Sequence, residues 1–134
     1  MTYEFTVYGD PKAQPRPRRS KNGGVYTPNT AKAYKESIVL AIKNDRGWKQ
    51  ITRACKLYVV FGFRRPKSHY TKHGRSKKWV YYHTCKPDGD NAAKSVADAI
   101  VSSGLLKDDC LISQWEITKV YDREPSTRIE LFEL

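Results

Sequence analysis

One stretch, Leu57–Phe63, constrains the fold more than any other, because β-branched and aromatic residues dominate it and charged residues are absent. That composition predicts a buried strand. The chain has 134 residues, of which 39% are apolar and 12% aromatic, and this suffices for one modest hydrophobic core. We therefore expect a single domain over residues 1–134.

Helix signals lie on both sides of this strand. The segment Thr27–Thr30 offers capping side chains ahead of apolar residues at helical spacing, which predicts a helix that ends near Asn44. A second helix is predicted over Asp90–Ser103, with Gly104 where a helix stop is expected.

Strand signals complete the pattern. Polar and apolar residues alternate over Tyr3–Tyr8, and two closing strands are predicted over Ile112–Tyr121 and Thr127–Glu133. The short connection between the closing strands favours an antiparallel hairpin. The order β-α-β-α-β-β predicts an α+β fold with two helices and a small mixed sheet of about four strands.

The charge of the chain changes sign along the sequence. Residues 1–87 include 20 basic and 4 acidic residues, residues 88–134 include 5 basic and 10 acidic residues, and the formal net charge is +11. Such a basic excess needs a polyanion. Nucleic acid fits better than lipid, because the basic residues lie in Gly- and Pro-rich loops and not on an amphipathic helix.

Two segments are basic loops. Gln14–Gly24 is expected to be exposed and to be mobile without a ligand. Arg64–Lys78 is a candidate binding loop, because it is basic and unusually long for a connection within a compact domain. The two loops contain most of the candidate DNA-contacting residues. These candidates are Arg16, Arg18, Arg19, Lys21, Arg64, Arg65, Lys67, Lys72, Arg75, Lys77, Lys78 and Lys86.

Five aspartates fall within one short segment of this basic chain. They are Asp88, Asp90, Asp98, Asp108 and Asp109. Asp90 is placed to cap the second helix, and Lys94 and Asp98 follow on the same face at intervals of four residues. The helix would be roughly 21 Å long. Asp109 can therefore rejoin Asp88 only if the backbone doubles back or if a second subunit supplies it.

Carboxylates brought together repel one another unless a cation neutralises them, and hard oxygen ligands suit Mg²⁺ or Mn²⁺. Beside a large basic surface, this set matches the needs of phosphodiester hydrolysis, in which metal ions activate a water and a lysine offsets phosphate charge. Each residue also has an ordinary interpretation. Asp90 alone can be a plain cap, Asp108–Asp109 a surface turn, and Lys94 half of an ion pair.

A second set of metal-ligating residue types consists of His69, His73, His83 and Cys85. No second thiol completes a tetrahedral zinc site, so DNA contacts by this loop are the preferred interpretation. The three cysteines form no C-x-x-C pair and are expected to be buried, reduced thiols.

Aromatic residues can stack on exposed bases. For Trp79, Tyr81 and Tyr82, which flank the second basic loop, base stacking and core packing are equally favoured, whereas Trp48 is assigned to the core. The amino-terminal segment lacks a signal-peptide pattern, and no apolar run approaches the roughly 18 residues of a membrane span. We expect a cytoplasmic protein that uses neither a membrane nor a small-molecule cofactor.

The segment Lys86-Pro-Asp-Gly-Asp-Asn-Ala-Ala-Lys94, followed by Asp98-Ala99, Gly104 and Asp108-Asp109, resembles the signature of the RusA family of Holliday junction resolvases. The resemblance extends to the amino-terminal strand, the first basic loop and the closing strands, so it covers nearly the whole chain. It implies a homodimeric, Mg²⁺-dependent endonuclease, with Mn²⁺ as a substitute ion, that introduces paired nicks at four-way DNA junctions. Such proteins are common in bacteria, prophages and phages.

Carried over by position, the resemblance implies metal binding by Asp88, Asp90 and Asp109 and an essential catalytic role for Lys94. The positions with a supporting role are Asn91, Asp98 and Asp108. Two other functions stay open on sequence grounds. One is a recombination accessory protein that binds DNA without catalysis, and the other is a nuclease that cuts flaps, replication forks or linear duplex.

Overall fold

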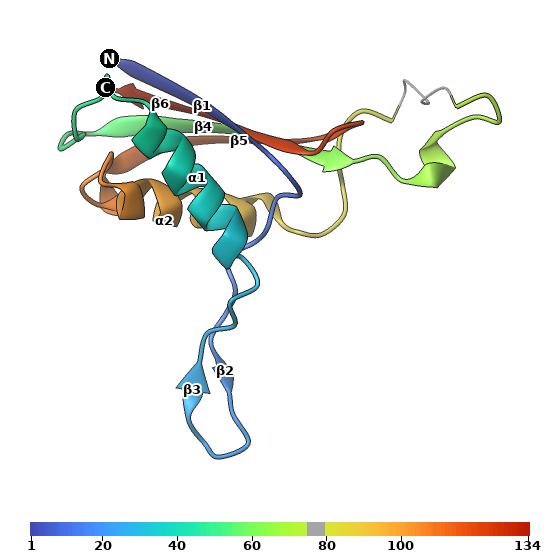
Figure 1. The fold of residues 1–134 in the computed structure, drawn as a ribbon, viewed down its shortest axis with the longest axis horizontal. Coiled ribbons are helices and arrows are strands. Elements are labelled where there is room, and N and C mark those ends of the chain that lie inside the picture. Colours follow the sequence, from blue (N-terminus) through green and yellow to red (C-terminus); the bar gives the residue numbers. More distant parts are fainter. Residues whose placement is uncertain (75–79) are drawn as a thin grey trace.

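A mixed four-stranded sheet forms one layer of the molecule in the computed structural model, which describes residues 1–74 and 80–134 (Figure 1). In spatial order its strands are β1 (Thr2–Tyr8), β6 (Ser126–Glu133), β4 (Cys55–Arg64) and β5 (Ile112–Asp122). The β1–β6 and β6–β4 pairs are antiparallel, and the β4–β5 pair is parallel. The predicted α+β class is confirmed, and β4 contains the predicted buried strand. Four residues from the sequence predictions, Arg75, Lys77, Lys78 and Trp79, lie outside the described ranges.

The two closing strands do not form a hairpin, so this part of the prediction is wrong. β4 lies between β5 and β6, which are connected by residues 123–125 alone. Two strand spacings amount to roughly 9.6 Å, which the backbone between Asp122 and Ser126 can span. The short connection between β5 and β6 therefore did not require these two strands to pair. The strand between them is β4, the most completely buried strand of the sheet.

Two helices cover the same face of the sheet (Figure 1). They are α1 (Lys32–Asn44) and α2 (Gly89–Ser103). The core between helices and sheet contains fully buried side chains from both layers. Its largest members include Ile38, Ile42, Leu57, Phe61, Ile100 and Leu131. A buried hydrogen bond of 2.5 Å between the hydroxyls of Tyr34 and Thr127 connects α1 to β6.

The helix boundaries confirm two predictions and correct two. α1 ends at Asn44 as expected, but its N-cap position is Ala31, so no side chain of Thr27–Thr30 caps it. α2 ends at Ser103 as expected, and Gly104 is its C-cap, with a φ of +90° that suits glycine. The N-cap position of α2 is Asp88, not Asp90, which lies in the first turn.

The first basic loop contains a short β-ribbon, where the sequence predicted no regular structure. β2 (Arg18–Arg19) pairs antiparallel with β3 (Val25–Tyr26). The ribbon projects away from the two layers of the body (Figure 1). We call residues 16–28 the arm.

The second basic loop contains a short 3-10 turn, η1 (Lys67–His69). Beyond the loop, the segment Tyr81–His83 runs antiparallel to β5, with Tyr82 opposite Val120. Among the described residues, no helix is long and apolar enough to cross a membrane.

The three cysteines are free thiols, but only Cys55 is buried. Cys85 and Cys110 are exposed, so the predicted burial is wrong for them. Cys85 lies on the segment that leads into α2, and Cys110 lies in the 3-10 turn that follows this helix.

Candidate functional site

Two of the predicted carboxylates, Asp88 and Asp90, lie at the amino-terminal end of α2, and both are exposed. The partial positive charge of a helix amino terminus favours negative side chains there. Gly89 between them is packed closely against β5, because a Cβ at this position would lie 3.1 Å from Ile117 Cγ2. The sheet therefore fixes the helix end that presents the two carboxylates to solvent.

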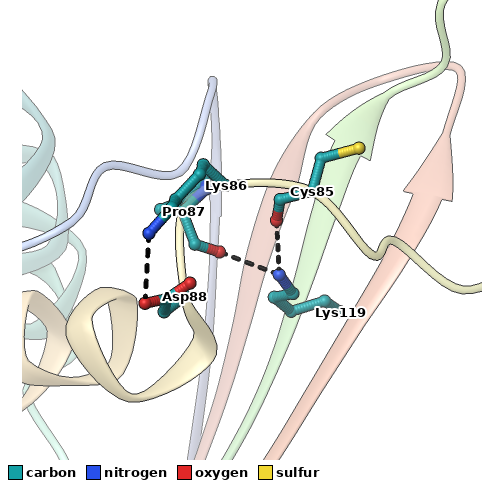
Figure 2. A network of polar contacts seen from close by, with 5 residues as sticks. All are labelled: Cys85, Lys86, Pro87, Asp88 and Lys119. Atoms are coloured by element: carbon teal, nitrogen blue, oxygen red, sulfur yellow. Dashed lines mark hydrogen bonds and ion pairs between the residues drawn. The ribbon is translucent and has the colours of Figure 1, made fainter.

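Lys119 on β5 holds the backbone that leads into this helix end (Figure 2). Its ammonium donates hydrogen bonds to the carbonyl oxygens of Cys85, at 2.7 Å, and Pro87, at 2.8 Å. Lys86 reaches Asp88 Oδ2 at 3.5 Å, in a solvent-exposed ion pair. The sequence analysis missed Lys119, since a lysine in the middle of a strand has no spacing signal that separates it from an ordinary surface residue.

We expect Lys119→Met to lower the free energy of unfolding by about 1–3 kcal/mol, because it leaves two carbonyl groups without a charged donor. Urea denaturation followed by circular dichroism measures the change. Lys107→Met is the matched control, since Lys107 is an exposed lysine whose side chain makes no hydrogen bond or ion pair with the described residues. Equal stability of the two variants would show that Lys119 does not hold the segment.

Asp90, Lys94 and Asp98 all lie on the exposed face of α2, as their spacing predicted. Asp98 pairs with Lys35 of α1, with Nζ and Oδ2 2.7 Å apart. Within the part of the chain that the structure describes, Lys94 makes no ion pair. The ion-pair interpretation of Lys94 is therefore wrong, and its ammonium is open to an anionic ligand.

Asp108 and Asp109 lie where the chain turns back after α2, at the start of the 3-10 turn η2 (Asp109–Leu111). Asp108 accepts a hydrogen bond from Cys110 N at 3.1 Å, and this bond lowers the pKa of Asp108. The hydrogen bond with Asp108 raises the pKa of Asp109, and burial and the negative charges of Asp108 and Asp98 raise it further. Asp109 is thus within electrostatic range of Asp98, which is the tenth residue of α2.

The predicted metal ligands are not gathered within one chain. Across residues 1–74 and 80–134, no group of three His, Cys, Asp or Glu side chains could hold a metal ion. The helical rise from Asp88 to Asp98 is about 15 Å, and Asp109 lies in the turn that follows the carboxyl end of α2. At the amino-terminal end of α2 the chain presents two exposed carboxylates, Asp88 and Asp90, whose oxygen atoms could hold Mg²⁺ because this ion retains several waters.

The same described ranges contain no zinc site. His83 is buried and stacks on Phe63 with ring centroids 3.8 Å apart, and His69 packs edge-on against Tyr121 at 4.7 Å. Burial lowers the pKa of His83, and the positive charge of Lys119 lowers it further. These histidines support the base of the second basic loop and are packed against aromatic rings.

Basic side chains and Asp88 line a common hollow of about 530 Å³ between the base of the arm and α2. A backbone hydrogen bond of 3.1 Å from Gln14 N to Asn91 O joins the two elements. The basic residues that line the hollow are Lys12, Arg16, Arg18 and Lys86. The sequence analysis predicted DNA contacts for all of these except Lys12, which lies in the same acid-free stretch.

The other predicted DNA contacts are spread over both basic loops. Exposed members are Arg19, Lys21, Arg64, Lys67 and Lys72. Arg65 differs from them, because its guanidinium hydrogen-bonds to Val80 O and lies 5.5 Å from the centroid of the Tyr121 ring. Arg65 is therefore engaged within the chain at the base of its loop.

Comparison with known proteins agrees with this arrangement. The family model described as "Endodeoxyribonuclease RusA" matches residues 8–132, a range that includes the arm, α2 and Asp109. The uncharacterized protein YqaN of Bacillus subtilis (strain 168) is 34% identical over 137 residues, covering 98% of this chain and 96% of that protein. The chain belongs, as its motif predicted, to the RusA family of endodeoxyribonucleases.

Proposed function

We propose that this protein is a Mg²⁺-dependent, homodimeric endonuclease that resolves four-way DNA junctions by paired nicks. Membership of its family indicates an endodeoxyribonuclease, a hydrolase of DNA phosphodiester bonds. The observation that carries the finer proposal is the hollow in which Asp88 lies among four basic side chains. A phosphate that these side chains attract would arrive beside the carboxylates at the end of α2.

Asp88 and Asp90 would hold the metal ion, and their exposure leaves space for water and for phosphate oxygens. Mg²⁺ bound there would activate a water and stabilise the leaving oxygen. Mn²⁺ takes similar oxygen ligands and would substitute. Lys94 lies one turn beyond Asp90. Its ammonium makes no ion pair with the described residues and would offset negative charge on the attacked phosphate.

Asp109 would complete this site from the second subunit. Within one chain it follows the carboxyl end of α2, so the length of this helix separates it from Asp88 at the amino-terminal end. A twofold axis that sets two α2 helices antiparallel would place Asp109 of each subunit near Asp90 of its partner. The dimer would then present two identical sites to a substrate that is itself twofold symmetric.

A mixed dimer tests this arrangement. One chain has Asp90→Asn, the other has Asp109→Asn, and each homodimer should be inactive on a four-way junction. In the mixed dimer, intact Asp90 and intact Asp109 meet at one of the two sites, so single nicks should return. Co-expression with two different affinity tags gives the mixed dimer, and denaturing gels measure the nicks.

A doubly tagged Asp90→Asn dimer is the matched control and should remain inactive. If the mixed dimer is also inactive although it binds the junction, the two aspartates act within one subunit. The proposed assignment of Asp109 to the partner would then be wrong.

A substrate panel separates junction resolution from the two other functions. The panel comprises a four-way junction, a 5′ flap, a replication fork and linear duplex, each with Mg²⁺. Preferential cleavage of the junction supports the proposal, and preferential cleavage of flaps or forks contradicts it. Binding of every substrate without cleavage would indicate an accessory protein.

A further inference from the structure

Tyr81 and Tyr82 form an exposed aromatic pair on the segment that follows the second basic loop and runs beside β5. Their ring centroids lie 5.0 Å apart in edge-to-face geometry. Tyr81 is 51% exposed and Tyr82 is 65% exposed, so neither packs in the core. Of the two interpretations that the sequence left open for them, core packing is wrong.

The backbone that carries the pair is fixed to the sheet. Tyr121 N donates to Tyr81 O at 2.8 Å, and His83 N donates to Lys119 O at 3.0 Å. Tyr82 lies between these two bonds and pairs with Val120. Because the segment is already ordered, a ligand that contacts the rings would not have to order it.

Tyr82 also shares a hollow of about 430 Å³ with Asp90. Gly89, at the start of α2, and residues of β5, among them Thr118 and Lys119, also line this hollow. A group that packs against Tyr82 would therefore lie beside a carboxylate that the proposed function assigns to the metal.

We propose that Tyr82, supported edge-on by Tyr81, stacks on an unstacked base of the DNA strand that is cut at Asp90. This inference rests on the proposed function, and it identifies the part of the DNA substrate that the two rings would contact. The charge of the neighbouring loop favours DNA as the occupant, since Arg64, Lys67 and Lys72 are exposed on it.

Stacking on an aromatic ring is tolerant of base identity, because every base has a π-face. A base whose stacking is already interrupted costs least to capture. Bases at a branch point are in this state and bases within a continuous duplex are not. The aromatic pair would therefore contribute to the choice of junctions over linear duplex.

The experiment uses a four-way junction with 2-aminopurine at the branch point and the full-length protein without metal. Wild type should quench the 2-aminopurine fluorescence through stacking. Tyr82→Ala should abolish the quenching and weaken junction binding by about 5- to 150-fold. Tyr82→Phe keeps the ring and should restore both.

Tyr8→Ala is the matched control, because Tyr8 is 68% exposed and lies on β1 at the opposite edge of the sheet. It should behave as wild type. Quenching by Tyr82→Ala at the wild-type level would overturn the inference, and so would an equal loss of quenching and binding in Tyr82→Phe. A third contrary result, in analytical ultracentrifugation, would be a dimeric wild type and a monomeric Tyr82→Ala variant. The last would show that the rings contact a second subunit.

Both readouts are independent of catalysis. A wild-type protein that quenches the probe but cuts no DNA after Mg²⁺ is added would contradict the proposed function and support stacking. A single-stranded 2-aminopurine oligonucleotide, run in parallel, presents unstacked bases even if four-way junctions are not the substrate. Cleavage of the junction with wild-type quenching by Tyr82→Ala would contradict stacking alone.

Discussion

Asp90→Asn should abolish junction cleavage and leave junction binding unchanged or tighter. The substitution keeps the size of the side chain and removes the negative charge that would hold the metal ion. Metal-ion catalysis is worth several kcal/mol of transition-state stabilisation, so the cleavage rate should fall at least about 100-fold. Binding should not weaken, because the substitution removes a carboxylate that repels the DNA phosphates at the amino-terminal end of α2.

Cleavage is measured on denaturing gels with Mg²⁺, and binding by fluorescence anisotropy without metal. Asp45→Asn is the matched control, since Asp45 is an exposed aspartate that follows α1. It should cut at the wild-type rate. A parallel loss of binding and cleavage in Asp90→Asn would indicate that Asp90 supports the fold and not the reaction.

Phe61→Ala should lower the free energy of unfolding by about 3–5 kcal/mol, the usual cost of removing a buried aromatic side chain. Phe61 is fully buried on β4. This strand lies between β6, its antiparallel neighbour, and β5, its parallel neighbour. Domains of this kind have a total stability of about 5–15 kcal/mol. The substitution should therefore remove a large share of it.

Urea denaturation measures the loss, with Tyr8→Ala as the control. Tyr8 is an exposed aromatic residue, so its removal should change stability by no more than about 0.5 kcal/mol. Similar losses in both variants would mean that β4 does not lie at the centre of the core.

The predictions that succeeded depend on local patterns. The apolar spacing of α2 and the composition of β4 both reflect burial along a single element, and burial leaves a periodic signal in the sequence. The stripe of Asp90, Lys94 and Asp98 could be predicted for the same reason, because helical spacing alone sets which side chains share a face.

The features that the sequence did not reveal depend on contacts between distant segments. Strand order places β4 between β5 and β6, and nothing within the two closing strands encodes that insertion. Lys119 contacts Pro87 across 32 positions. The position of Asp109 near Asp98 depends on how the chain turns after α2, which spacing along the sequence does not determine.

The most direct test of the account is cleavage of a fixed and a mobile four-way junction beside linear duplex of the same sequence, with Mg²⁺. The account predicts nicks at symmetric positions in two opposing strands of the junctions, little cleavage of the duplex, and no nicks with EDTA. Equal cleavage of duplex and junction would contradict junction resolution, and a junction that is bound but not cut would contradict catalysis.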